Sequence, residues 1–232
     1  MEKEQLIRKL HEELQAVRGE RLAAKRDPAL LSARTALKVY QSQRLARTHA
    51  AVLAAEDTHD AAEFFLEELY GTHDLSQRDA DFERIIPTMQ RMLSYESLHT
   101  ITEGIVLDAL SERLDTAMAV ALGEHFSEGQ YLEAYRSVTT PAERQRQLDL
   151  VQALGDSLCK LVRIPLLSMT LKIMHTPAKM AGLGDLQEFL ANGFTTFKRM
   201  RKPSEFVDSV VARERQTSQN IFAGRLRPFE ID

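Results

Sequence analysis

The stretch DTHDAAEFFLEELYGTHDLSQRDADFERIIPTMQRML, Asp57–Leu93, decides the fold class that the sequence predicts. In its first half the apolar residues Ala62, Phe65, Leu66 and Leu69 follow the i, i+3, i+4, i+7 spacing of one helix face. Acidic residues fill another face of the same helical wheel. This half of the stretch therefore predicts a short amphipathic helix.

The second half of the stretch predicts another helix after a tight corner. Gly71 is suited to end the first helix, because a residue without a Cβ adopts the left-handed conformation at little cost. Residues 72–75 then form a loop, and Ser76 begins the next helix with Asp79 as its capping partner. Pro87 lies inside that helix and is expected to bend it. The apolar face of this second helix consists of Phe82, Ile85, Ile86 and Met89.

Composition agrees with an all-α protein. The 232 residues include 44% hydrophobic and 28% charged residues, which is enough apolar mass for a sizeable core. Ten Gly and seven Pro are too few for the frequent turns of a β-sandwich, and no alternating strand pattern is present. We therefore predict a single-domain bundle of about seven to nine helices.

Cap signals place several helix boundaries along the chain. A narrow stripe of Leu6, Leu10, Leu14 and Val17 marks a helical arm at residues 1–26, and Asp27-Pro28 begins the bundle domain at 27–232. The helix that follows has no Gly or Pro to break it before about residue 55. Further helices are predicted at 95–122, at about 127–138, from Thr140-Pro141 onward, at 185–201 and from Pro203 to Gly224.

For two of these predicted helices the sequence also predicts how they pack. Residues 95–122 contain apolar positions with 3-4-3-4 spacing, which predicts a helix buried along one seam. The segment LCKLVRIPLLSMTLKIM, residues 158–174, is apolar on nearly every side and is predicted to lie in the middle of the bundle. Thr176-Pro177 is expected to end that central helix. The seam of helix 95–122 consists of Leu107, Leu110, Leu114, Ala117 and Ala121.

Charge and cysteine content narrow the possible functions. A net charge of −4 gives no general attraction to nucleic acid or to membranes, and no apolar run is long enough to span a bilayer. The single Cys159 excludes an intrachain disulfide, and the charged N-terminus lacks the apolar core of a secretory signal, so a cytoplasmic location is expected. Nucleotide-binding loops and nucleophile motifs are missing from the sequence.

Two Glu-x-x-His pairs, Glu56 with His59 and Glu96 with His99, form the one candidate metal site in the sequence. Residues three apart lie on one helix face, and di-iron or di-manganese sites in helix bundles use two such pairs with one further Glu from each of two other helices. Such a site would make the protein a carboxylate-bridged oxidoreductase. The candidate ligands are Glu56, His59, Glu63, Glu67, Glu96, His99 and Glu103.

The same residues also fit solvated helix faces. His59 and Glu63 have the spacing of an exposed i, i+4 contact, and Asp57 or Thr58 is suited to cap a helix, which would separate Glu56 from His59. The additional glutamates lie on the same two helices as the pairs and fit the di-metal template poorly. The sequence therefore favours solvated faces over a metal site.

An apolar ligand pocket is a third possibility, because Met and Phe side chains make adaptable linings. Packing in the core explains the same residues equally well. A basic cluster, Lys198, Arg199, Arg201 and Lys202, lies at a helix C-terminus, where the helix dipole alone favours it, so nucleic-acid binding is not favoured. The candidate pocket residues are Met169, Met174, Met180, Phe189, Phe194 and Phe197.

The string FFLEELYG at Phe64–Gly71 resembles the motif of a family of bacterial helical proteins named for FFLEELY. SQRDADFERIIP at 76–87 and GLGDLQEFLANGFTTFKRM at 182–200 extend the resemblance over roughly residues 60–225. The resemblance implies an all-helical bacterial protein and brings no activity or site residues with it.

We interpret the sequence as that of a non-enzymatic binding or interaction protein. The narrow stripe on the arm at 1–26 suggests that the arm mediates association instead of completing the core. Residues 1–50 carry a charge of +5 and residues 56–84 a charge of −8, so the arm of one chain could lie on the acidic hairpin of another. A homodimer is therefore expected.

Overall fold

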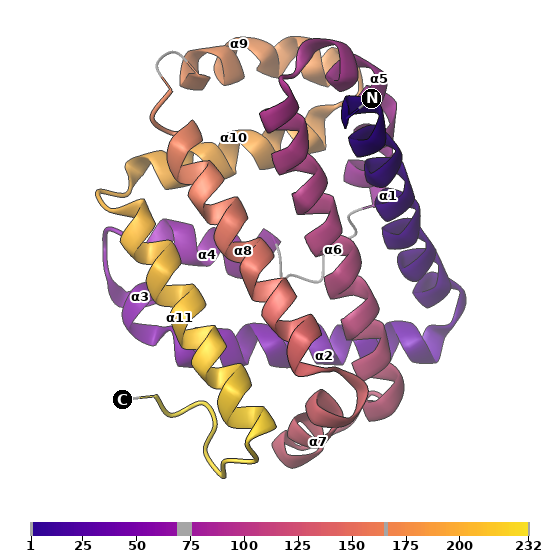
Figure 1. Ribbon diagram of the computed structural model, residues 1–232, viewed down its shortest axis with the longest axis vertical. Helices are drawn as coiled ribbons and strands as arrows, with labels where there is room; N and C mark the ends of the chain where they lie inside the picture. The colour runs from indigo at the N-terminus through magenta and orange to yellow at the C-terminus, as the bar shows by residue number, and fades with distance from the viewer. Residues whose placement is uncertain (1, 69–75, 165–166, 232) are drawn as a thin grey trace.

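Long helices dominate the computed structural model, which describes residues 2–68, 76–164 and 167–231 (Figure 1). Within these ranges the chain forms eleven α-helices and no strand, which confirms the all-α prediction and exceeds the predicted seven to nine. Gly71 and the predicted loop at 72–75 lie outside the described residues. The helices are α1 (Glu2–Arg26), α2 (Pro28–Thr48), α3 (Ala50–Ala54), α4 (His59–Glu68), α5 (Ser76–Met92), α6 (Tyr95–Leu122), α7 (Glu128–Val138), α8 (Pro141–Leu161), α9 (Leu167–Met180), α10 (Gly184–Arg199) and α11 (Pro203–Phe222).

Helix α6 is the central element, and it packs against α1, α2, α7 and α8. In Figure 1, α1 runs along one side of α6 while α8 and α11 lie on the other side. Of the five seam residues predicted for α6, Leu114 is fully buried and the others are partly or fully exposed. A single seam was the wrong expectation because several neighbours cover α6 on different faces. They bury residues such as Leu98, Thr102, Ile105 and Glu112.

The apolar stripe of α1 belongs to the core of its own chain. Leu10, Leu14 and Val17 are almost completely buried, and the first two pack in one apolar cluster with residues of α5 and α6 such as Ile86 and Leu98. The expectation that this stripe lies outside the core is therefore wrong. A narrow stripe is sufficient here because α1 lies in the angle between two helices, which cover the stripe from both sides.

The predicted caps are present where the described residues allow them to be seen. The Asp27 carboxylate accepts hydrogen bonds from the backbone N–H groups of Ala29 and Leu30 at the start of α2. Capping boxes begin α7 and α8: Ser127 pairs with Gln130, and Thr140 pairs with Glu143. Gly123 and Gly224, with φ values of 67° and 69°, follow the ends of α6 and α11.

The predicted helix from residue 28 to about 55 is interrupted at His49. This residue has φ −110° and ψ 27°, so the chain leaves the helical conformation between α2 and α3. The side chain of His49 is buried against Glu214 of α11, a tertiary contact that local sequence does not encode. The break at His49 and the separation of α9 from α8 account for the larger number of helices.

Of the segment predicted to lie in the middle, Cys159 and Val162 are buried in the core. Its second part forms α9, which lies at the edge of the molecule, across one end in Figure 1, and not in the middle as predicted. It packs mainly on α10, and the side chains of Met169, Ile173 and Met180 are 51%, 65% and 84% exposed. The prediction that Thr176-Pro177 ends the helix is also wrong, because α9 continues to Met180. Proline removes one backbone donor, and the helix continues for another turn in which Ala178 is buried.

The two phenylalanines of the FFLEELY string anchor α4 to α10 and α11. Phe65 contacts Phe197 and Phe206 with ring centroids 5.6 and 6.1 Å apart, and Phe64 lies 5.7 Å from Phe189. A Cβ added at Gly193 would come within 3.0 Å of the Phe64 ring, so the glycine permits this close approach. Both rings therefore serve the core that joins the two halves of the chain.

We predict that Gly155→Ala destabilises the protein by about 1–3 kcal/mol, because overpacking a tight contact forces its neighbours to move. Gly155 of α8 faces α11, and an added Cβ would lie 2.5 Å from Cγ1 and 2.8 Å from Cγ2 of Val207. The matched control is Gly19→Ala in α1, where nothing lies within 4 Å. This control should gain about 0.5–1 kcal/mol from helix propensity. Urea unfolding followed by circular dichroism measures both, and equal stability of the two variants would contradict the packing argument.

Candidate functional site

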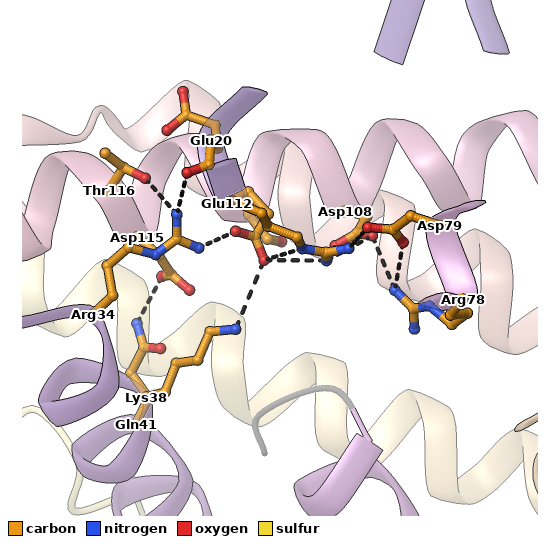
Figure 2. A network of polar contacts seen from close by, with 12 residues as sticks. Glu20, Arg34, Lys38, Gln41, Arg78, Asp79, Asp108, Glu112, Asp115 and Thr116 are labelled. Carbon is orange, nitrogen blue, oxygen red and sulfur yellow. Dashed lines mark hydrogen bonds and ion pairs between the residues drawn. The ribbon is translucent and has the colours of Figure 1, made fainter. Parts of the chain in front are cut away.

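A network of charged side chains connects α1, α2, α5 and α6 inside the bundle (Figure 2). It contains four basic and four acidic residues, so their formal charges balance. Three of the acids project from α6, and the bases reach them from α1, α2 and α5. The members are Arg21, Arg34, Lys38 and Arg78 with Asp79, Asp108, Glu112 and Asp115.

Glu112 accepts contacts from three cations at the centre of this network. It is 4% exposed, one of its oxygens pairs with Arg34, and the other lies 3.2 Å from Arg21 and 3.7 Å from Lys38. Burial acts to raise the pKa of Glu112, but attraction by Arg21, Lys38 and Arg34 outweighs burial and lowers the pKa. Glu112 is therefore an ionised carboxylate whose charge depends on its neighbours.

Asp108, one helical turn earlier on α6, has the opposite environment. Arg21 Nη2 donates to its Oδ1 at 2.8 Å and Arg78 Nη2 donates to its Oδ2 at 3.2 Å. Burial nevertheless raises the pKa of Asp108, because the two cations are shared with Asp79 and Glu112, whose negative charges also oppose ionisation. The network therefore combines a carboxylate that is held ionised with one that protonates more easily.

The chemistry of this network is that of ion pairing between helices. Buried charges lose their hydration, and pairing compensates for that loss only where the partners are correctly placed. Arg21 contacts Asp79, Asp108 and Glu112 at once, so it fixes the position of α1 relative to both α5 and α6. We interpret the network as the element that sets how these helices fit together.

A second buried cluster joins the end of α2 to α11. Arg44 Nη1 lies 2.5 and 2.6 Å from the two oxygens of Glu214, and His49 Nε2 lies 2.9 Å from Oε1. Burial acts to raise the pKa of Glu214, but Arg44 and the hydrogen bonds lower it from 4.5 to about 2. Sequence reasoning missed this cluster because Glu214 is 165 residues from His49 and 170 residues from Arg44 along the chain.

The candidate metal ligands do not converge. Glu56 lies in the turn before α4, so it shares no helix with His59, whereas Glu96 and His99 are exposed on the first turn of α6. His59 and Glu63 form the expected exposed contact, with Nε2 and Oε2 3.8 Å apart. Glu67 is also exposed on α4.

The remaining candidate, Glu103, pairs with two cations, at 3.2 Å from Lys9 Nζ and 2.8 Å from Arg146 Nη2. Among the residues that the structure describes, no group of three or more His, Cys, Asp or Glu side chains is placed to hold a metal ion. The geometry of the described residues therefore gives the proposed di-iron or di-manganese site no ligand set.

The six candidate pocket residues are divided between two environments. Phe194 and Phe197 are buried in the aromatic core, and Phe189 contacts both Phe64 and the guanidinium of Arg78. The three methionines lie on the outside of α9. A recess of about 300 Å³ between α9 and α10 includes only Phe194 of the six. Its lining consists of Leu171, Lys172, His175, Gln187, Ala191, Phe194 and Thr195.

The basic cluster lies at the C-terminal end of α10, as predicted, with Lys198 and Arg199 in its last turn. Arg199 and Arg201 pair with Asp60 and Asp57 near the start of α4, each at 3.1 Å. These arginines therefore attach α10 and the segment after it to the acidic turn before α4.

The outer face of α9 is the most unusual surface of the described structure. Large apolar side chains project from it into solvent, although the apolar face of a helix is usually buried against the rest of the protein. Leu171 and Ala178 point inward to α10, and Lys172, His175 and Lys179 lie on the flank beside the recess. This arrangement offers an apolar stripe with basic residues beside it.

The fold and its surfaces define an all-helical protein with a charge-paired interior and an apolar face on α9. The chain belongs to the family described as Domain of unknown function (DUF8198), whose model matches residues 20–228. No curated protein and no solved structure matches the chain. No helix within the described ranges is both long and apolar enough to cross a membrane.

We predict that Glu112→Gln lowers the free energy of unfolding by about 3–5 kcal/mol, because it leaves Arg21, Arg34 and Lys38 buried without their shared anion. The matched control is Glu205→Gln, which removes a mostly exposed carboxylate that pairs with Lys202. This control should change stability by less than about 1 kcal/mol. Urea unfolding at pH 7 gives both values, and a loss below about 1 kcal/mol in Glu112→Gln would show that the network contributes no more than a surface pair.

We predict that Glu214 contributes a stability that acid removes. Its folded-state pKa of about 2 lies below the ordinary value of 4.5, so its carboxylate stabilises the fold fully above about pH 4.5. This contribution decreases as the pH falls from 4.5 toward 2. The difference in unfolding free energy between the wild type and Glu214→Gln should therefore shrink over this range. Urea titrations at pH 6, 4 and 3 measure it, and a constant difference would contradict the role of the charge.

Proposed function

We propose that this protein is a non-enzymatic helical binding protein whose contact surface is the outer face of α9. The observation that carries the proposal is the exposure of Met169, Ile173 and Met180 along one side of that helix. Their spacing of four and seven residues aligns them in a single stripe. Isolated apolar residues are normal on a protein surface, but an aligned group on one helix marks a contact site.

The distribution of exposed apolar residues supports this choice of surface. Within the described residues, fourteen large apolar side chains are exposed, and seven of them lie between residues 161 and 190. The other seven are spread over five elements from α1 to the C-terminal tail. The concentration around α9 therefore favours one contact region. Its members are Leu161, Ile164, Met169, Ile173, Met174, Met180 and Leu190.

The chemistry of the stripe supports binding more than catalysis. Methionine has a flexible, polarisable side chain that adapts to the shape of a partner, as at other adaptable binding surfaces. The carboxylates of the buried networks, by contrast, are taken up by ion pairs between helices. The interior therefore holds the helices together, and the α9 face supplies the contact.

We also propose that the protein is cytoplasmic and comes from a bacterium. The single cysteine supports a cytoplasmic protein. The resemblance of FFLEELYG and the two downstream segments to the FFLEELY proteins supports a bacterial source. A homodimer would use a surface other than the α1 stripe, because that stripe is buried in its own chain.

We predict that a photoreactive benzoylphenylalanine at Ile173 forms a covalent adduct with a partner in living cells. The matched control is the same residue at Val120 of α6, which is also exposed and apolar, while the only other large exposed apolar residue of α6, Tyr95, is 25 residues away. Irradiation followed by mass spectrometry identifies adducts with protein or with lipid. An adduct at position 173 and none at position 120 supports the proposal, and equal results at the two positions contradict it.

A further inference from the structure

The residues around α9 differ sharply in charge from the rest of the chain. Residues 157–184 contain Lys160, Arg163, Lys172 and Lys179 and no Asp or Glu, which gives +4 over 28 residues in a chain of net charge −4. The overall charge of −4 therefore conceals one strongly basic segment. A partner for this segment should carry negative charge.

The lysines and the apolar stripe occupy neighbouring faces of one helix. Leu171 and Ala178 face α10, and Met169, Ile173 and Met180 lie nearly opposite them, at the greatest distance from the body of the protein. Lys172 and Lys179 project between these two faces and are exposed. A side chain of this length can reach a charged group that lies level with the apolar stripe.

The geometry points to docking of α9 on a bilayer surface that contains anionic phospholipids, an inference that rests on the proposed function and names its partner. In this arrangement Met169, Ile173 and Met180 enter the boundary between headgroups and acyl chains. Lys172 and Lys179 then pair with lipid phosphates at the same depth. Helices that lie in the plane of a membrane combine an apolar face with basic residues in this way.

The position of α9 suits a flat partner. Helix α9 crosses one end of the molecule, so its outer side faces away from the other helices (Figure 1). The stripe lies on the convex outer side of the helix, and the recess of about 300 Å³ lies on the other side of the lysines, next to α10. A convex apolar ridge inserts readily into the fluid surface of a bilayer. A helical peptide as partner would need an apolar groove on this protein, and the outer face of α9 is a ridge.

A second copy of this chain is a poorer partner for the same face. A two-fold symmetric contact would place the α9 helices of two chains together, because such contacts use the same surface patch twice. Lys172 and Lys179 of one chain would then approach the same residues of the other. Like charges at close distance oppose association, and the segment contains no acidic residue to offset them.

The test uses the purified full-length protein and sedimentation with vesicles in 0.1 M NaCl. We expect binding to vesicles of equal parts phosphatidylcholine and phosphatidylglycerol, and much weaker binding to phosphatidylcholine alone. Lys172→Glu/Lys179→Glu should reduce the partition coefficient on mixed vesicles by roughly thirtyfold, because each basic residue near an anionic surface contributes a factor of about five. Ile173→Asp should also reduce binding, since it places a charge in the apolar stripe.

The matched control is Arg47→Glu/Arg225→Glu, which makes the same change in net charge at exposed positions on α2 and just after α11. Figure 1 shows α2 and the C-terminal end of α11 at the end of the molecule away from α9. Charges farther than about 10 Å from the membrane are screened at this salt concentration, so this control should bind within roughly twofold of the wild type. Circular dichroism confirms that each variant is folded.

The outcomes separate this inference from the proposed function. A lack of binding to mixed vesicles, or equal losses in the α9 pair and the control pair, would overturn docking on a bilayer. If Ile173 then still gives an adduct with a protein, α9 remains the contact surface and its partner is a protein. If position 173 gives no adduct and the vesicles do not bind, both proposals are wrong.

Discussion

The pairing of buried charges around α6 is the constraint on which the rest of the bundle depends. Glu112 has to be matched by Arg21, Arg34 and Lys38, because an ionised group without partners in the interior would cost several kcal/mol. These cations come from α1 and α2, so both helices are fixed against α6 at the level of Glu112. Apolar packing contributes most of the favourable free energy, but it is non-directional. The ion pairs therefore determine which of many apolar contacts are made.

The apolar face of α9 is exposed, in contrast to the buried apolar stripe of α1. The stripe of α1 is covered by α5 and α6, whereas the outer face of α9 has no element of the described chain over it. Each square ångström of apolar surface removed from water is worth about 25 cal/mol, so a partner that covers α9 gains affinity without rearranging the core. The interior is thus complete without a partner, and the exposed surface is what distinguishes α9 from the other helices.

The sequence predicted the positions of most helices. It did not predict which side chains come together at the candidate site. Caps at Asp27, Ser127 and Thr140 depend on residues three or fewer positions apart, and these predictions were confirmed. The six candidate pocket residues were grouped by residue type alone, and the structure divides them between the core and the surface. The 28-residue basic segment is visible in the sequence, but its meaning depends on which side of α9 the lysines and methionines occupy.

By itself the sequence determined the helical class, the start of α2, α7 and α8, and the positions where glycine ends α6 and α11. These features follow from short-range hydrogen bonding, capping and backbone sterics, which involve neighbouring residues only. Only the tertiary structure decided that α1 is covered, that His49 interrupts a helix and that an apolar helix lies outside. These outcomes depend on contacts such as His49 with Glu214, 165 residues apart, where solvent exclusion and charge pairing between distant segments outweigh local preference.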